Sequence, residues 1–419
     1  MMAANSAGVR RRPGRWAWLG WSLPWLVLAA ALWWWAWPMQ LERACWVREW
    51  PFEEGCPDVP DAGVPGQPSA DYVAHLQRNV GDSRALAWLA SAYWSEGDAR
   101  AADVLPWALQ LAPNQSGVLL LDAQARLQAG DWGAAARALI TLLERGQTQA
   151  GPDLLALMRS PRTAPAVLAQ LSGDALWLDP LLATLDRKAP VAPLLPFVTA
   201  GQEKGLLKPA TVLALIDRLQ QEGGWLDAYG LWVAWRGPVA PGLYNGGFDH
   251  ASLRRGFDWA WTPQPAARQG FRVDQVSAAP RPGSMLELTL TGRGALPTPL
   301  VSQAMILTGE RYRLRGQVMV DRLLAKEGLV WALRCAGGGE RWAQSAPVLD
   351  TQRRWVPIEL EFEPPADCGA AVRLQLETTA AWEARAGMVG TVDFDDFTLE
   401  SLPGDTEPAP RNKPRGATP

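Results

Sequence analysis

Apolar residues recur along this 419-residue chain in three different patterns. Residues 16–37 form an apolar stretch without any charged side chain. From Ala70 to Arg236 the apolar positions follow the period of an amphipathic helix. Beyond residue 242 they alternate with polar positions, which is typical of half-buried strands. These patterns predict a multidomain fold class: a single N-terminal transmembrane helix, an all-α solenoid, then an all-β antiparallel sandwich.

The first apolar stretch predicts a transmembrane helix over residues 16–38. A helix rises ~1.5 Å per residue, so this stretch covers about 33 Å and matches a hydrocarbon core of ~30 Å. Tryptophans gather at both of its ends, as in the aromatic belts of membrane helices. A buried core helix is the alternative, and it fits poorly because the stretch lies near the start of the chain and follows a basic cluster.

Charges on either side of the stretch predict its orientation. The basic segment 1–15 contains Arg10, Arg11, Arg12 and Arg15, which we expect in the cytoplasm. Acids outnumber bases in the Pro-rich linker 39–69 that follows. The expected location is therefore a bacterial inner membrane, with one pass, a cytoplasmic N-terminus and a periplasmic C-terminal bulk. A cleaved signal peptide is the alternative, although the apolar region is long and rich in Trp for one.

The predicted helical domain, residues 70–237, contains an internal repeat. The segment that starts at Ala92 and ends in Gly97 and an Asp reappears from Ala125 to Gly130 and another Asp. We expect each glycine to end the first helix of its unit. Over residues 84–146 the pattern resembles the tetratricopeptide repeat, although Gly146 stands where Pro113 stands in the first unit. The resemblance implies a stack that binds a protein partner, with a rigid spacer as the alternative.

The alternating region, residues 242–402, predicts eight or nine strands in an antiparallel sandwich. Leu286, Leu288 and Leu290 share one phase, for example. The phase of the apolar residues slips at Asp395 and Asp396, which predicts a β-bulge in the last strand. The Pro-rich tail, residues 403–419, is expected to be disordered.

Motifs at the two ends of this region suggest a family. It opens with Asn-Gly-Gly-Phe-Asp at 245–249 and closes with Val-Asp-Phe-Asp-Asp-Phe-Thr-Leu at 392–399. A Gly-x-x-Tyr-x-Leu segment at 309–314 lies between them. Together these motifs resemble those of jelly-roll carbohydrate-binding modules over residues 244–402. The resemblance implies polysaccharide binding and a structural calcium ion between the first and last strands.

The resemblance directs attention to particular side chains. Asp249, Asp393 and Asp396 would supply the hard oxygen ligands that calcium prefers, and a solvated acidic edge is the alternative. Trp261, Trp342 and Trp382 fall in predicted loops, and an indole ring stacks well on a sugar ring. These three tryptophans are the candidate carbohydrate contacts, with a purely structural role for the sandwich as the alternative.

The four cysteines suggest a disulfide framework. Cys45, Cys56, Cys335 and Cys368 allow three pairings, of which Cys45–Cys56 and Cys335–Cys368 are the simplest. Disulfides would suit an exported protein, and four free thiols are the alternative.

Composition then narrows the function. A net charge of -3 argues against a nucleic-acid partner, and two histidines argue against a His-led active site. The sequence contains no nucleotide-binding, serine-hydrolase or zinc-protease motif, so we expect no catalysis and no cofactor beyond the calcium.

We therefore expect a non-catalytic, membrane-anchored scaffold of the bacterial envelope. Its repeats would bind a protein and its sandwich a glycan, in exopolysaccharide or cell-surface polysaccharide biogenesis. Two alternatives remain. One is a glycoside hydrolase-like enzyme that uses carboxylates among Asp393, Asp395 and Asp396, and the other is a scaffold that binds protein only.

Overall fold

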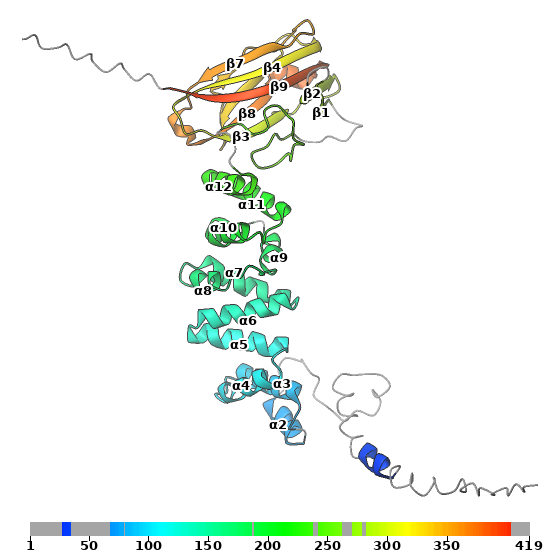
Figure 1. Ribbon diagram of the computed structural model, residues 1–419, viewed down its shortest axis with the longest axis vertical. Helices are drawn as coiled ribbons and strands as arrows, with labels where there is room; N and C mark the ends of the chain where they lie inside the picture. Colours follow the sequence, from blue (N-terminus) through cyan, green and yellow to red (C-terminus); the bar gives the residue numbers. More distant parts are fainter. Residues whose placement is uncertain are drawn as a thin grey trace, which may run out of the picture. The chain divides into compact units, whose positions relative to one another are not determined.

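The computed structural model describes residues 27–34, 68–78, 80–186, 188–237, 242–261, 270–278 and 282–403 (Figure 1). Contacts within the chain divide it into two compact units, Met1–Ala150 and Gly151–Pro419. The described part of the first unit is helical, and that of the second combines helices with strands. The bounds of the six domains expected from the sequence stay predictions.

The first unit pairs its helices. They are α2 (Ser69–Arg78), α3 (Ser83–Glu96), α4 (Ala101–Leu111), α5 (Ser116–Ala129) and α6 (Trp132–Glu144), followed by the short η2 (Thr148–Ala150). Gly97 ends α3 and Gly130 ends α5, both in the left-handed conformation, as the repeat predicts. Asp82 and Asp131 cap the helices that follow them by accepting backbone N–H groups.

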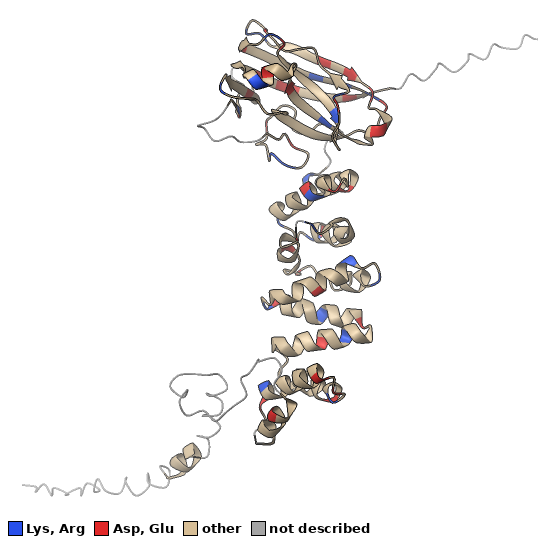
Figure 2. Ribbon diagram, turned by 180° about the vertical axis from the view of Figure 1, so that it is seen from behind, with Lys and Arg blue, Asp and Glu red and all other residues tan. Residues whose placement is uncertain are grey.

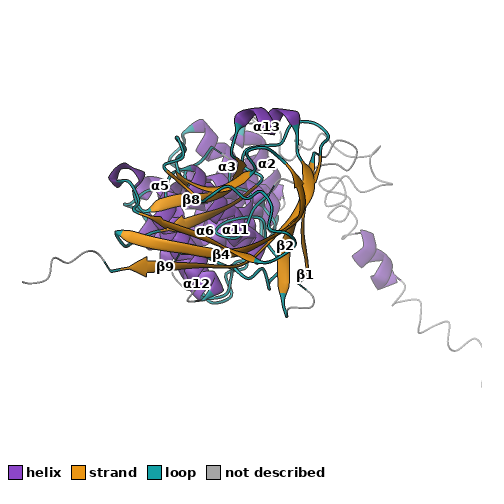
Figure 3. Cartoon of the chain, turned by 90° about the horizontal axis from the view of Figure 1, so that it is seen from above, coloured by secondary structure: helices purple, strands orange, loops and turns teal. Residues whose placement is uncertain are grey.

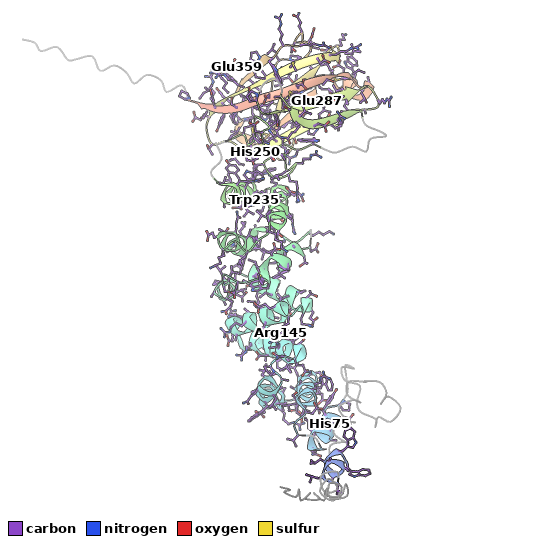
Figure 4. All side chains as sticks on the ribbon, turned by 45° about the vertical axis from the view of Figure 1, so that its right-hand side comes forward. His75, Arg145, Trp235, His250, Glu287 and Glu359 are labelled. Carbon is purple, nitrogen blue, oxygen red and sulfur yellow. A yellow bond between two sulfur atoms is a disulfide. The ribbon has the colours of Figure 1, made fainter. Side chains whose placement is uncertain are left out.

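A side chain links the ends of the two repeat units. Arg145, labelled in Figure 4, donates from Nη1 to the carbonyl of Pro113 at 3.1 Å and from Nη2 to Asn114 at 2.8 Å. The second helical repeat therefore ends with an arginine that binds the end of the first repeat. This arginine precedes Gly146, where the sequence departs from the repeat pattern.

The expected transmembrane helix is contradicted. Residues 27–34 are helical. Within the described residues, no helix combines the length and the apolar character needed to cross a membrane. The prediction over 16–38 and the inner-membrane location drawn from it are corrected accordingly. The rest of that range lies outside the described residues.

The second unit begins with short helices. They are α7 (Gly151–Arg159), α8 (Ala164–Leu168), α9 (Leu178–Ala183), η3 (Ala192–Leu194), α10 (Leu195–Glu203), α11 (Pro209–Gln221) and α12 (Trp225–Arg236). Prolines stand in the first turn of α8, α10 and α11, where the missing N–H costs nothing. The frequent prolines in this segment thus begin helices, and the helices between them are short.

Two antiparallel sheets follow, which confirms the predicted β-sandwich. One has the strand order β1-β2-β9-β4-β7 and the other β3-β8-β5-β6. The strands are β1 (Phe271–Ser277), β2 (Ser284–Thr291), β3 (Val301–Ile306), β4 (Arg311–Leu324), β5 (Leu329–Cys335), β6 (Ala343–Gln344), β7 (Val356–Phe362), β8 (Ala371–Thr378) and β9 (Val389–Leu402). A short η5 (Ala366–Cys368) precedes β8, and α13 (Ala381–Ala386) precedes β9.

Aromatic rings fill the space between the sheets. Trp259 and Trp331 are fully buried, with ring centroids 5.6 Å apart, and Phe394 and Phe397 of β9 pack on Trp331. Both phenylalanines point inward because the register of β9 shifts between them, at Asp396, which has a φ of 53°. This is the predicted β-bulge.

Helices α11 and α12 pack directly on the sandwich. Asp217 of α11 accepts the N–H of Gly256 at 3.0 Å and forms an ion pair with Arg255 at 2.6 Å. Trp232 of α12 is fully buried, and its ring meets that of Tyr244 edge-on at 5.3 Å. These contacts explain why the last helices belong to the same compact unit as the strands.

One of the two predicted disulfides is formed. Cys335 at the end of β5 is bonded to Cys368 in η5. Cys45 and Cys56 lie outside the described residues, so their pairing stays a prediction.

Candidate functional site

The two sheets differ in how open their outer faces are. On the four-stranded sheet, residues that point away from the core are nevertheless buried, among them Ile306, Val330 and Ala332. On the five-stranded sheet, most outward positions are half-buried or exposed. We call this surface the open face. Glu287 and Glu359, both labelled in Figure 4, lie on it.

Alternation along β2 and β9 explains which side chains reach the open face. Leu286, Leu288 and Leu290 point into the core, so Glu287 and Thr289 point outward. On β9 the buried Val392 and Phe394 point inward, and Asp393 between them points outward.

A row of polar side chains crosses the open face. Asp274 of β1 lies directly opposite Glu287 of β2 in the strand register, and Glu287 lies opposite Asp393 of β9. On its other side, Asp393 lies opposite Met319 of β4. We call the first three residues the acidic row. Directly opposite residues on antiparallel strands lie within ~5 Å, so these carboxylates influence one another.

Asp393 is the unusual member of the acidic row. Its side chain is only 4% exposed, and its Oδ1 atom has no hydrogen-bond partner among the described residues. Burial, and then the charges of Glu287 and Asp321, raise the pKa of Asp393 to about 6. A buried acceptor without a donor costs ~1–3 kcal/mol. This carboxylate therefore keeps an unused acceptor, which a ligand reaches only if a neighbouring side chain turns aside.

The other carboxylates of the row have partners. Asp274 forms an ion pair with Arg272 at 2.5 Å, and the same arginine reaches Glu287 at 3.6 Å. Thr289 also donates to Glu287 at 3.3 Å. Asp393 is thus the member of the row that a ligand would satisfy.

The far end of the open face is closed by ion pairs. Arg313 pairs with Glu361, and hydrogen bonding to this arginine holds the pKa of Glu361 below its usual range. Arg315 lies 3.2 Å from Glu359 and 3.6 Å from Glu400. We call this group the arginine ladder. Its charges are matched within the sheet, so it offers little to a charged ligand.

The three tryptophans predicted to contact sugar lie in different surroundings. Trp261 is 9% exposed and is covered by the guanidinium of Arg254 at 4.5 Å. Trp342 is half-buried and packs edge-on against Phe362. Trp382, on α13, is 48% exposed. Of these three, Trp382 alone presents a broad ring surface, and the sugar-contact roles stay predictions.

The predicted calcium ligands do not converge. Asp249 accepts the N–H of Ser284 at 3.2 Å, Asp393 belongs to the acidic row, and Asp396 is exposed at the bulge. Across the described ranges, no group of three or more His, Cys, Asp or Glu side chains is placed to hold a metal ion. A calcium ion would therefore need backbone or water ligands, and it stays a prediction.

Sequence reasoning missed most of the open face. It identified Asp393 but not its neighbours Glu287 and Met319, nor the cations discussed below. The signal was present, because Met285, Glu287 and Thr289 occupy the phase opposite to the buried leucines of β2. What the alternation could not tell is which sheet keeps its outer face uncovered.

Comparison with known proteins assigns no family. No protein-family model matches the chain. No curated protein matches it either.

Solved structures similar to this chain are mainly carbohydrate-binding modules, and they correspond to its C-terminal β region. A structure described as "CBM4 structure and function" is 19% identical, with a TM-score of 0.29, and the match covers 38% of this chain and 99% of that one. The CBM22-1 xylan-binding domain of Paenibacillus barcinonensis Xyn10C is 18% identical, with a TM-score of 0.24 and coverage of 39% and 96%. The family 11 module of the Clostridium thermocellum cellulase Lic26A-Cel5E is 10% identical, with a TM-score of 0.22 and coverage of 39% and 97%.

At these identities and scores, the likeness carries no argument about a ligand. None of the comparisons supports the tetratricopeptide likeness or a membrane anchor. The chain is similar, in its sandwich, to carbohydrate-binding modules.

Proposed function

We propose that the β-sandwich is a non-catalytic carbohydrate-binding module and that the glycan lies on the open face. The observation that carries this proposal is the buried Asp393 carboxylate, whose Oδ1 has no donor within the described residues. Sugar hydroxyls are donors of the right kind, and a hydrogen bond to a charged acceptor contributes ~1.5–3 kcal/mol.

The surroundings of Asp393 suit a sugar. Three polar side chains near it are half-buried: Thr289, Glu287 and Gln317. Each can direct a donor or an acceptor toward a ligand while the rest of the side chain stays packed on the sheet. Met319 adds an apolar surface next to Asp393, on which the C–H side of a ring can rest. A few polar groups set in a partly apolar surface are typical of small-molecule and sugar sites.

The test is binding of the full chain to soluble polysaccharides, measured by isothermal titration calorimetry. Asp393→Asn keeps the shape but replaces a charged acceptor by a neutral one, a loss of about 1 kcal/mol or roughly fivefold in affinity. Asp367→Asn, at an exposed aspartate in η5, is the matched control and should bind like the unmodified chain.

Two results would overturn the proposal. One is that no polysaccharide in a broad panel binds, and the other is that Asp393→Asn binds as tightly as the control.

A glycosidase that uses the same carboxylates is the second candidate. It is favoured by the raised pKa of Asp393 beside Glu287, because glycosidases pair a protonated acid with a carboxylate. We place it second because Glu287 is already engaged by Arg272 and Thr289. Release of reducing ends from a bound glycan, lost in Asp393→Asn, would reverse this order.

For the helices we propose a protein partner. Trp107 and Leu111 of α4 are 62% and 54% exposed. Leu111 also lines a hollow of about 570 Å³ with Arg84, Trp88 and Asn114. Exposed apolar side chains beside a hollow are typical of protein contacts. A place in polysaccharide biogenesis is part of this proposal and rests on the sequence resemblance.

A further inference from the structure

One end of the sandwich gathers segments that are distant in the sequence. There β2 and β4 end and β9 begins, with α13 beside them (Figure 3). The N–H of Gly292 donates to the carbonyl of Met388 at 2.7 Å, and that of Leu296 to Ala384 at 2.7 Å. The N–H of Lys326 donates to Glu383 at 2.6 Å. These bonds place the three connections and α13 at the same end.

Four cations at this end are exposed and carry no ion pair within the described residues: Arg293, Arg322, Lys326 and Arg385. We call them the basic end. Charged residues of both signs lie on the sandwich (Figure 2), and elsewhere on it Arg272, Arg313 and Arg334 each form an ion pair with an acid. Unmatched cations at one end create a positive field that attracts anions.

The acids at this end neutralise it only in part. Glu383 is 2% exposed, and its carboxylate accepts the N–H groups of Lys326, Glu327 and Gly328 at 2.6 to 3.0 Å. Asp321 forms an ion pair with Arg353. Glu383, Glu327 and Asp350 thus set three negative charges against the four cations, which leaves one positive charge in excess.

Apolar side chains accompany the cations. Leu324 of β4 and Val389 of β9 are register partners and are 56% and 41% exposed. Trp382, next to Glu383, is 48% exposed. An indole and two aliphatic side chains among cations suit a ligand with both a ring face and a negative group.

The basic end continues the open face. Thr391 points outward because Val392 beside it is buried, and Arg322 is the register partner of Thr391. Val389 lies four residues before Asp393 on the same strand, which is about 13 Å at ~3.3 Å per residue. A polymer that contacts Asp393 therefore reaches Arg322 and Lys326 within a few sugar rings.

We propose that the glycan of this module is anionic, a polyuronate in chemical class. Its hydroxyls would donate to Asp393, and its carboxylates would lie against the basic end. This inference rests on the proposed glycan binding, and it adds the charge of the substrate and the residues that recognise it.

The experiment measures binding of the full chain to polygalacturonate and alginate, each compared with the same polymer after reduction of its carboxyl groups. We expect the native polymers to bind about tenfold more tightly than the reduced ones, and the difference to shrink at high salt. Arg322→Gln combined with Lys326→Gln should remove most of the difference. The matched control, Arg137→Gln with Lys204→Gln at exposed positions outside the sandwich, should retain it.

The outcomes separate this inference from the proposed function. Binding of neutral or reduced polymers as tightly as native ones overturns the anionic substrate and leaves glycan binding standing. Absence of binding to any polymer overturns both. Binding to vesicles of anionic phosphatidylglycerol but not to either polyuronate overturns the inference in favour of a membrane surface.

Discussion

At the scale of single residues, Asp393 is the residue on which the proposed binding site depends most. Alternation places it outward, yet packing leaves it 4% exposed, and it lies between Glu287 and Met319 across the sheet. An outward carboxylate is normally solvated, so its burial is a property of the assembled sheet rather than of β9 alone. The same carboxylate that weakens the free protein is available to a ligand.

The loss of folding stability caused by the buried Asp393 carboxylate depends on pH. The pKa of Asp393 is raised to about 6 in the folded chain, so the folded state holds its proton where the unfolded state has lost it. Stability is therefore fully present below pH ~4, falls as the pH rises to ~6, and stays lower above. A rise in pKa of this size corresponds to at most about 3 kcal/mol, and solvent screening at this partly buried group lowers that value.

We expect Asp393→Asn to melt at a higher temperature than the unmodified chain at pH 7 and at the same temperature at pH 4. Thermal unfolding followed by circular dichroism measures both. An equal change at the two pH values would contradict the raised pKa.

At the scale of elements, Gly256 joins the helices to the sandwich. Its φ is 66°, and a Cβ atom added to it would lie 2.8 Å from the ring of Trp232. Both observations exclude a side chain, because the backbone would be strained and a fully buried ring would have to move. The contact between α12 and the sandwich thus depends on this glycine.

Gly256→Ala should lower the free energy of unfolding by about 1–3 kcal/mol. Gly230→Ala in α12 is the matched control. Its Cβ would meet nothing within 4 Å, and alanine favours a helix, so a gain of up to ~1 kcal/mol is expected. Chemical denaturation measures both, and an equal loss in the two variants would show that the junction is not the cause.

At the scale of the whole molecule, two compact units carry two proposed activities. Leu111 and the hollow beside it belong to the first unit, whereas Asp393, the basic end and Trp382 belong to the second. Each activity should therefore respond to substitutions in its own unit only.

Leu111→Lys, at the exposed last residue of α4, should remove crosslinks to the protein partner in cells and leave glycan affinity unchanged. Lysine suits the C-terminus of a helix, so α4 should stay folded. Trp382→Ala should weaken glycan binding several-fold and leave the crosslinks intact. If either variant affects both activities, the division of labour between the units is wrong.

The sequence by itself determined the features that depend on local pattern. These are the helix ends at Gly97 and Gly130, the inward phase of strands such as β2, and the bulge at Asp396, whereas the Cys335–Cys368 disulfide was one of several open pairings. Helical and strand periods and helix capping act over a few residues, so neighbouring sequence is enough to predict these three features. The same local reasoning was wrong for the membrane helix, since no helix within the described residues is long and apolar enough to cross a membrane.

Only the tertiary structure decided which surfaces are free. Trp261, Trp342 and Trp382 were all predicted to contact sugar from loops. In the structure, Trp261 and Trp342 are largely covered by other side chains. The burial of Asp393, the openness of one sheet face and the meeting of Arg293, Arg322 and Lys326 at one end likewise depend on segments far apart in the chain. Alternation tells which way a side chain points, and only the packing of the other elements tells what lies there.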